Sequence, residues 1–534
     1  HDEPRPILIY DGDCAFCRVW VEHWRRLTGD RVRYAPFQEV EGDYPTIAHE
    51  DFERGVQLVM PDGTIYRNAE AVFRLLRDAP RRGWLLRAYQ HVPLFAPISE
   101  LFYRFIGRHR DLGYHLTRSL WGNPGPHSYV LTRWLFLRSL GVIYLIAFWS
   151  LSTQILGLIG SGGILPAAGF LQRVAANLPT VDRFIRVPTL AWIDASDPML
   201  MFLCYGGIAL SVLLILDVLS APVLLLLWLF YLSLTSIGQA FLSFQWDGLL
   251  LETGFLAIFL GSTRLLPGII RRRQPSLVVI YLFRWLLFRL MFSSGMVKLL
   301  SRDTLENPNR WRDLTALNYH YWTQPIPTPL AWFVHQLPDW FHQLSVVLTL
   351  VIELGVPLLY FAPRRLRMLG AALTIALMAL IILTGNYTFF NWLTIALCIP
   401  LLDDQALSRF VPRRFARRMI ETSVWTPRNV FQKLGIAALA VVILFTTTVR
   451  FAGTIGLSDG SWMPKPLSDV VTLSAWLSTA RTYGLFAVMT EARPEIVVEG
   501  SNDGETWQPY VFRYKANEID EPPPWVAPHQ PRLD

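Results

Sequence analysis

Apolar runs of nearly constant length recur between residues 131 and 449. A helix needs about 20 predominantly apolar residues to cross a bilayer. Nine runs approach this length, and we interpret them as about nine membrane spans of a polytopic α-helical bundle. They are Leu131–Ser150, Met199–Leu216, Pro222–Phe241, Asp247–Gly261, Leu277–Leu300, Leu344–Phe361, Met368–Gly385, Phe389–Leu402 and Leu434–Val449.

The first 120 residues follow another pattern, in which short β-type runs alternate with amphipathic stretches. Period-two and helical spacings predict strands and helices, respectively. Strands are expected at Ile7–Tyr10, Val32–Phe37, Val56–Met60 and Thr64–Arg67, and helices from Cys14, over Ala69–Leu76 and onward to about Arg108. A strand followed by C-x-x-C at a helix start indicates a thioredoxin-like α/β domain.

The C-terminal part leaves the apolar pattern again. Tyr483–Met489, Glu495–Glu499 and Trp507–Tyr514 are predicted strands, the last two joined by a turn, and a proline-rich tail follows. The predicted fold class is therefore multi-domain. Residues 1–120 form the thioredoxin-like domain, 121–451 the transmembrane domain with an extracytoplasmic loop at 301–342, and 452–534 a small extracytoplasmic β-rich domain.

The composition agrees with a membrane protein. Hydrophobic residues make up 52% of the chain and charged residues 17%, whereas a soluble globule carries about a quarter charged residues. The formal net charge is +7. Because the arginines lie between apolar runs rather than on one face, we expect membrane lipids as a partner and no nucleic acid.

Arginine density predicts the orientation, since cytoplasmic loops are enriched in Lys and Arg. Residues 262–274, 362–367 and 403–433 are dense in arginine, whereas 153–197 and 301–342 have balanced charge. This assignment places the N-terminus in the cytoplasm and the C-terminus outside.

Cys14 and Cys17 are the first candidate reactive residues. The positive end of a helix stabilises a thiolate at its N-terminus, so Cys14 could attack a disulfide and Cys17 could resolve the mixed disulfide. Two alternatives stay open, a zinc half-site that His23 and His49 complete and a pair of idle thiols. We expect no metal and no cofactor. The remaining cysteines, Cys204 and Cys398, lie in apolar runs and are expected to be inert.

Ionisable residues inside spans are costly and suggest function. The intramembrane polar candidates are Gln245, Asp247, Glu252, Glu353 and Asn386, together with Lys298, which is the candidate base. Arg284 and Arg289 could instead snorkel to headgroups or pair with Glu252, and Lys298 could also snorkel. These residues predict a polar interior, either a buried network or a cavity.

The segment Met291–Pro329 concentrates aromatic and hydrogen-bonding side chains at a membrane edge. Its three prolines, Pro325, Pro327 and Pro329, predict an irregular loop. Aromatic and mixed polar groups dominate recognition patches. The expected client-binding residues are Trp311, Asp313, Thr315, Tyr319, His320, Tyr321 and Gln324.

Two family resemblances follow from specific motifs. The sequence Tyr10-Asp11-Gly12-Asp13-Cys14-x-x-Cys17, with Pro61-Asp62-Gly63 and Asn68–Val72 downstream, resembles the DCC family of thiol-disulfide oxidoreductase-like domains. The resemblance covers about residues 7–110. It implies a thioredoxin-like fold in which Cys14 and Cys17 are the working pair, with Asp11 and Asp13 in the same motif.

Residues 238–252, 311–325, 384–387 and Asn391 resemble the lipase maturation factor family over about residues 130–534. This resemblance implies a polytopic membrane protein that assists folding and export of lipases. Bacterial relatives often carry the DCC-like domain in front, so we expect an integral protein of a bacterial inner membrane. A shorter stretch, Ser294–Leu299, is similar to the vitamin K-dependent carboxylase family, in which the lysine that matches Lys298 acts as a base.

Our leading hypothesis is a membrane maturation factor that binds a secreted, lipase-like client and carries an attached thiol-disulfide redox domain. The alternative is a membrane enzyme, either a dithiol oxidoreductase with a thiol redox partner or a carboxylase-like enzyme with Lys298 as base. A transporter is disfavoured, because the two halves show no internal repeat.

Overall fold

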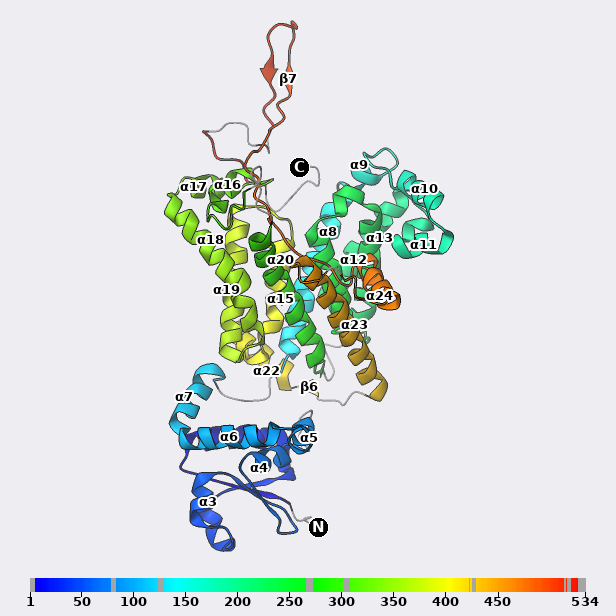
Figure 1. Ribbon diagram of the computed structural model, residues 1–534. Helices are drawn as coiled ribbons and strands as arrows, with labels where there is room; N and C mark the ends of the chain where they lie inside the picture. The colour runs from blue at the N-terminus through cyan, green and yellow to red at the C-terminus, as the bar shows by residue number, and fades with distance from the viewer. Residues whose placement is uncertain are drawn as a thin grey trace. The chain divides into compact units, whose positions relative to one another are not determined.

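The computed structural model describes residues 5–77, 83–122, 128–265, 272–301, 308–421, 423–424, 429–458, 460–512, 515 and 520–526. The chain divides into two units, His1–His127 with Pro363–Leu366, and Ser128–Ala362 with Arg367–Asp534. We call them the N-terminal unit and the helical unit, and each is described by itself (Figure 1).

The N-terminal unit is built on a four-stranded sheet of order β2-β1-β3-β4. Its strands are β1 (Ile7–Tyr10), β2 (Arg33–Pro36), β3 (Gln57–Val59) and β4 (Ile65–Arg67). β1 pairs parallel with β2 and antiparallel with β3, and β3 pairs antiparallel with β4. Alternate side chains of β1 enter cores on opposite faces of the sheet, Leu8 on one and Ile7 and Ile9 on the other. This arrangement confirms the predicted small α/β domain.

Helices cover the sheet and extend the N-terminal unit. They are α1 (Ala15–Thr28), α2 (Phe37–Val40), α3 (His49–Arg54), α4 (Asn68–Leu75), α5 (Gly83–His91), α6 (Phe95–Arg108) and α7 (Arg110–Leu120). The helix α1 begins directly after Cys14, as the C-x-x-C position predicts.

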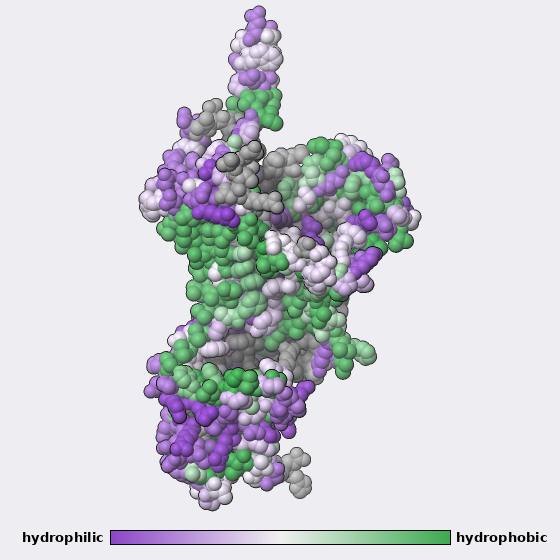
Figure 2. Space-filling model, viewed as in Figure 1, coloured by the Kyte–Doolittle hydropathy of each residue, from purple (hydrophilic) through white to green (hydrophobic). Residues whose placement is uncertain are grey.

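Seven helices of the described residues are long and apolar enough to cross a membrane. They are α8 (Val130–Ser152), α12 (Asp197–Ile215), α13 (Ser220–Ile237), α15 (Leu277–Leu300), α18 (Asp339–Leu354) with the following turn to Phe361, α19 (Arg364–Thr384) and α23 (Val430–Thr454). Figure 2 shows a broad hydrophobic area across the middle of the helical unit on the face in view. The predicted polytopic helical class is confirmed.

The predicted count of about nine spans is not confirmed. The other two predicted runs form the shorter helices α14 (Gln245–Ile258) and α20 (Phe390–Cys398). Each is shorter than a bilayer-crossing helix requires. α14 begins at a polar turn and carries Asp247 and Glu252, both buried, so part of its face serves a polar network rather than lipid.

The remaining elements lie at two ends of the helical unit. One end, which we call the α16 end, carries α9 (Ile155–Ile159), α10 (Ala167–Asn177), α11 (Thr180–Arg186), α16 (Ala316–Thr323) and α17 (Pro329–His335). The opposite end, the α22 end, carries α21 (Asp404–Leu407), α22 (Arg413–Glu421) and the short pair β5 (Arg272–Arg273) and β6 (Ser423–Val424). α24 (Lys465–Trp476) follows α23.

The predicted β-rich C-terminal domain is not confirmed. Residues 479–495, which we call the strap, contain no strand, and only β7 (Glu499–Gly500) and β8 (Gln508–Pro509) pair in the hairpin of residues 496–512. The strap is not a strand because its backbone groups bond to side chains of the bundle instead of to a neighbouring strand. Residues 513–514 of the last predicted strand lie outside the described residues.

The predicted irregular loop after Lys298 is also partly wrong. Residues 308–342 contain the helices α16 and α17 and the start of α18. Pro329 opens α17, with Thr328 as its N-cap. Proline is tolerated in a first helical turn because its missing N–H has no helical partner there. Residues 302–307 lie outside the described part.

Candidate functional sites

The tight turn after β1 positions the dithiol. Asp13 N donates to Asp11 Oδ1 (3.0 Å), and Gly12 N donates to Gln38 Oε1 (3.1 Å). A Cβ at residue 12 would lie 2.7 Å from Cβ of Pro36, so only glycine fits this close approach. The turn places Cys14 at the N-cap of α1.

The geometry distinguishes the two thiols. The Cys14 sulfur accepts a hydrogen bond from Cys17 N at 3.2 Å, and both cysteines are free and partly exposed. Hydrogen bonding from Cys17 and the nearby positive charge of Arg110 lower the pKa of Cys14 to about 6. The bond to Cys14 and burial raise the pKa of Cys17. The arrangement thus favours the thiolate form at Cys14 and the protonated thiol at Cys17.

Arg110 is a residue that the sequence interpretation missed. It lies at the start of α7, where its Nη1 donates to Asp11 Oδ2 at 2.8 Å. The positive charge of the same guanidinium favours the thiolate form of both cysteines, although the pKa of Cys17 is raised overall. Asp13 is held from the other side, with Gln38 Nε2 at 3.4 Å from its Oδ2. No local pattern identifies Arg110, because 99 residues separate it from Asp11.

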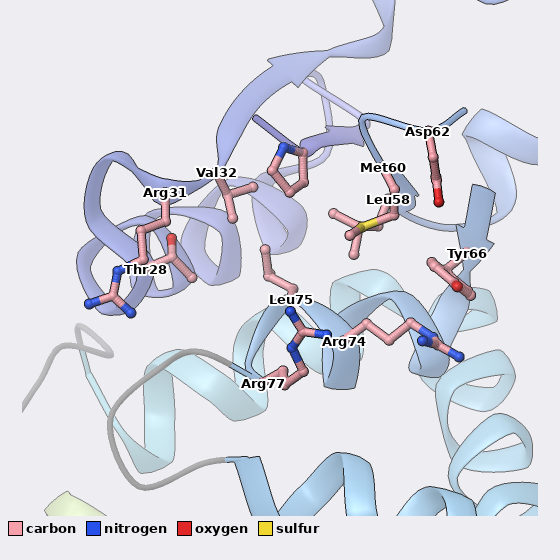
Figure 3. Close-up of a pocket in the computed structure, with 11 residues that line it drawn as sticks. Thr28, Arg31, Val32, Leu58, Met60, Asp62, Tyr66, Arg74, Leu75 and Arg77 are labelled. Atoms are coloured by element: carbon pink, nitrogen blue, oxygen red, sulfur yellow. The ribbon is translucent and has the colours of Figure 1, made fainter. Parts of the chain in front are cut away.

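A separate hollow of about 350 Å³ lies at the far end of the sheet (Figure 3). Its lining includes Pro6, Thr28, Leu58, Tyr66 and Arg74. Pro6 precedes β1 and Cys14 follows its end, and neither cysteine lines the hollow. Across the described residues, no group of three His, Cys, Asp or Glu is placed to hold a metal ion.

The second site is a buried ion pair where α15 meets α18. Lys298 Nζ donates to both carboxylate oxygens of Glu353, at 2.7 and 2.8 Å, and the two side chains are 4% and 8% exposed. The ammonium also lies 3.4 Å from Ser294 O and 5.0 Å from the centre of the Trp311 ring. Lys298 therefore neither snorkels to water nor presents a free amine.

The segment above this pair is packed rather than open. Trp311 is buried and donates through Nε1 to Phe486 O at 2.7 Å. Gln324 is buried and donates to Thr384 O at 2.8 Å. Tyr321 is buried in the same cluster as Trp311. Three of the expected client-binding side chains thus hold α16 against the bundle.

The other four expected client-binding residues are more accessible. Asp313 is exposed, whereas Thr315, Tyr319 and His320 are half-buried. Burial and the charge of Lys298 lower the pKa of His320 to about 4. Its imidazole ring packs edge-on against Phe486 at 4.9 Å between centroids. His320 is consequently neutral at physiological pH.

A third cluster centres on Glu252, which is fully buried in α14. It forms an ion pair with Arg289 of α15. Its Oε2 accepts from Tyr483 OH at 2.6 Å and from Arg481 N at 3.0 Å. Arg289 Nη1 donates to Arg481 O at 3.0 Å. The predicted polar interior is here a network that clamps the strap.

The remaining intramembrane candidates also have local partners. Gln245 Oε1 accepts from Gly484 N of the strap at 3.2 Å. Asp247 accepts a hydrogen bond from Tyr231 OH. Asn386 lies in the turn after α19, where its Oδ1 accepts from Thr388 N at 3.3 Å. Arg284 donates to Tyr129 OH at 3.0 Å instead of snorkelling.

These features define the class of the molecule: a polytopic helical membrane protein with an attached dithiol α/β unit. The family models agree with this class. The model of the lipase maturation factor transmembrane domain matches residues 131–409, and the model of its C-terminal domain matches 479–534. The model of DCC1-like thiol-disulfide oxidoreductases matches residues 8–116. The chain belongs to the lipase maturation factor family.

Individual relatives support the same assignment. Human Lipase maturation factor 2 is 37% identical, over 76% of this chain and 71% of its own length. Bovine Lipase maturation factor 1 is 31% identical, over 78% of this chain and 77% of its own length. Both are animal proteins, and the expected bacterial inner membrane stays a prediction. No solved structure matches the chain significantly.

Proposed function

We propose that this protein assists the folding or export of lipases or other secreted clients, which it binds at the α16 end. The relatives named Lipase maturation factor, which match about three quarters of the chain, support this function. The observation that carries the proposal is the clamped strap, which holds an exposed aromatic hairpin at a fixed place on the bundle.

The strap is held mainly through its backbone. Gln245 and Glu252 accept strap N–H groups, and Trp311 donates to a strap carbonyl. Farther along, Arg310 forms a two-point ion pair with Glu491, at 2.7 and 2.9 Å. These contacts fix the point at which the hairpin leaves the bundle. The exposed side chains of the hairpin therefore start from a defined position on the bundle.

The hairpin supplies the proposed client surface. Trp507, Tyr510 and Val511 are all exposed, and each strand pairs over only two residues. Exposed aromatic side chains and unpaired strand backbone suit an extended, partly folded client segment. Asp313 would add a polar contact, while the buried Trp311, Tyr321 and Gln324 support the surface from beneath. The half-buried Thr315, Tyr319 and His320 complete its edge.

We further propose that the α22 end faces the cytoplasm and the α16 end faces outward. The helix α22 alone carries four arginines and one glutamate, which favours the cytoplasmic side. α8 begins at this end, because its residues Val130 and Thr132 donate to Asp404 of α21. The N-terminal dithiol domain, which precedes α8 in the chain, would then be cytoplasmic.

The test is secretion of a lipase that is co-expressed with the full chain in cells lacking their own maturation factor. We expect Trp507→Ser with Tyr510→Ser to lower secreted lipase activity about tenfold or more, because aromatic hot spots carry most binding energy. Trp462→Ser, which removes an exposed tryptophan outside the hairpin, is the matched control. Equal secretion from both variants, at equal membrane levels, would contradict the proposal.

Thiol-disulfide exchange is the second candidate function, and the Cys14 thiolate geometry favours it. Cys14 would attack a disulfide, its sulfur would bond to one partner sulfur, and the other would leave as a thiolate. Cys17 would then displace the first partner sulfur, leaving Cys14–Cys17 oxidised and the partner reduced. The full chain should reduce an aromatic disulfide dye stoichiometrically, and Cys14→Ser should abolish this. A parent chain that is inert towards the dye would rule the activity out.

Lys298 gains no support as a catalytic base. A base must lose its proton, yet the Lys298 ammonium faces a carboxylate at hydrogen-bond distance through both oxygens. The carboxylase-like alternative therefore stays a prediction that rests on the sequence similarity.

A further inference from the structure

Helix α6 of the N-terminal unit carries apolar side chains on its outward face as well as towards the domain. Its inward face carries Glu100, which accepts from Glu70 N at 3.2 Å and from Tyr89 OH at 3.1 Å. Tyr103, on the same face, accepts from Val56 N at 3.0 Å through its hydroxyl. The helix is thus docked on the domain by these hydrogen bonds together with ring contacts, in which Phe95 packs on Phe73 and Tyr103 on the core, while no residue of α6 is fully buried.

The apolar stripe of α6 points away from the domain. Ile98, Leu101 and Phe102 are 61%, 64% and 65% exposed, and Phe105 continues the helical spacing. On α7, Leu112 and Leu116 are also exposed, one turn apart. Figure 2 shows hydrophobic residues gathered over the α5–α6 region. Monomeric soluble proteins rarely leave a contiguous apolar patch of this kind in water, so the face needs an occupant.

Basic residues around this stripe identify the occupant. Arg104 and Arg108 lie one turn apart on α6, and Arg118 lies on α7; all three are exposed. A helix with an apolar face and flanking arginines lies in the interface of a bilayer, where the arginines reach anionic headgroups.

The short connection between α7 and the candidate span α8 also limits how far α7 can lie from a bilayer. Only nine residues separate the end of α7 at Leu120 from the start of the candidate span α8 at Val130. Nine residues reach at most about 30 Å. We propose that α6 and α7 lie in the headgroup region of the membrane, on anionic phospholipids, and so anchor the dithiol unit to the bilayer surface.

The test uses the full chain in nanodiscs that contain spin-labelled lipids. A solvatochromic dye is attached to Phe102→Cys in a Cys14→Ser/Cys17→Ser background, in which the remaining native cysteines are buried. The matched control carries the dye at Asp62→Cys, in an exposed turn of the same unit. We expect shallow lipid spin labels to quench the dye at position 102 more strongly than deep ones, and neither to quench it at position 62.

Two further results are decisive. A dye at position 102 that is fully accessible to water would overturn the proposal. A dye that is shielded from water but not quenched by lipid labels would also overturn it, because a protein surface would then cover the face. Changing neutral discs to anionic ones should increase quenching, and Arg104→Gln with Arg108→Gln should reduce that increase, since each basic residue changes partitioning roughly fivefold and only Arg118 of the three remains. If quenching in the parent chain does not depend on lipid charge, the proposed binding to anionic headgroups is refuted. The readout needs neither a client protein nor the Cys14–Cys17 pair, so it is independent of both proposed functions.

Discussion

Removing Glu353 tests whether the Lys298 pair is structural or catalytic. Lys298 donates to both oxygens of Glu353, and both side chains are almost fully buried. Breaking a buried pair by removing one partner leaves an uncompensated charge and costs about 3–5 kcal/mol. Replacing both partners with apolar residues of similar volume is often neutral or stabilising by about 1–4 kcal/mol. The single and double variants therefore have opposite expected outcomes.

We expect Glu353→Leu and Lys298→Met each to lower the free energy of unfolding by about 3–5 kcal/mol, whereas Lys298→Met/Glu353→Leu returns close to the parent. The measurement is denaturant unfolding of the purified full chain in detergent micelles, followed by tryptophan fluorescence. Lipase secretion should recover in the double variant, because no step would need the ammonium. A stable double variant that supports no secretion would refute the structural assignment and restore Lys298 as a functional group.

Three further predictions concern the other sites. The alkylation rate of Cys14 should rise with a midpoint near pH 6, because its lowered pKa makes the thiolate predominate above that pH. Cys17→Ala removes the Cys17 thiol, whose hydrogen bond lowers the pKa of Cys14 most, and should move the midpoint upward although the backbone N–H of residue 17 remains. A parent midpoint near the ordinary thiol value of 9.0 would contradict this hydrogen bonding. Glu252→Gln leaves Arg289 without its carboxylate and should cost about 3–5 kcal/mol, so limited proteolysis should release the strap faster than in the parent. His320 should show no titration by NMR between pH 5.5 and 8, given its pKa of about 4; titration near the ordinary histidine value of 6.5 would show that it is solvated.

Much of the fold could be predicted because its signals are local. The strand Ile7–Tyr10 and the helix Leu277–Leu300 have the predicted bounds, since a short β-type run and a long apolar run each fix one structure. The strap could not be predicted. Tyr483–Met489 has a strand-like pattern, but its Gly484 N–H bonds to Gln245, 239 residues earlier.

The residues of the candidate sites could likewise be predicted only where the signal is local. Cys14 and Cys17 are predictable as a pair because three residues at a helix start bring them together. Lys298 and Glu353 were both recognised as costly intramembrane charges, yet nothing in the sequence pairs residues 55 positions apart. Arg110 carried no signal at all, because an arginine after an amphipathic helix is ordinary until its distance to Asp11 is known.

Polar contacts join the two regions that the lipase maturation factor models match, 131–409 and 479–534. The buried Glu252–Arg289 pair bonds to Arg481 and Tyr483 at the start of the strap. Farther along, the partly exposed Arg310–Glu491 pair adds a second link. A buried ion pair contributes little net stability, but a misplaced one leaves unpaired charge in an apolar interior. A shifted register of the strap would remove the bonds that Arg481 and Tyr483 make to Glu252 and Arg289. The network therefore specifies where the strap lies, and with it the place from which the hairpin projects.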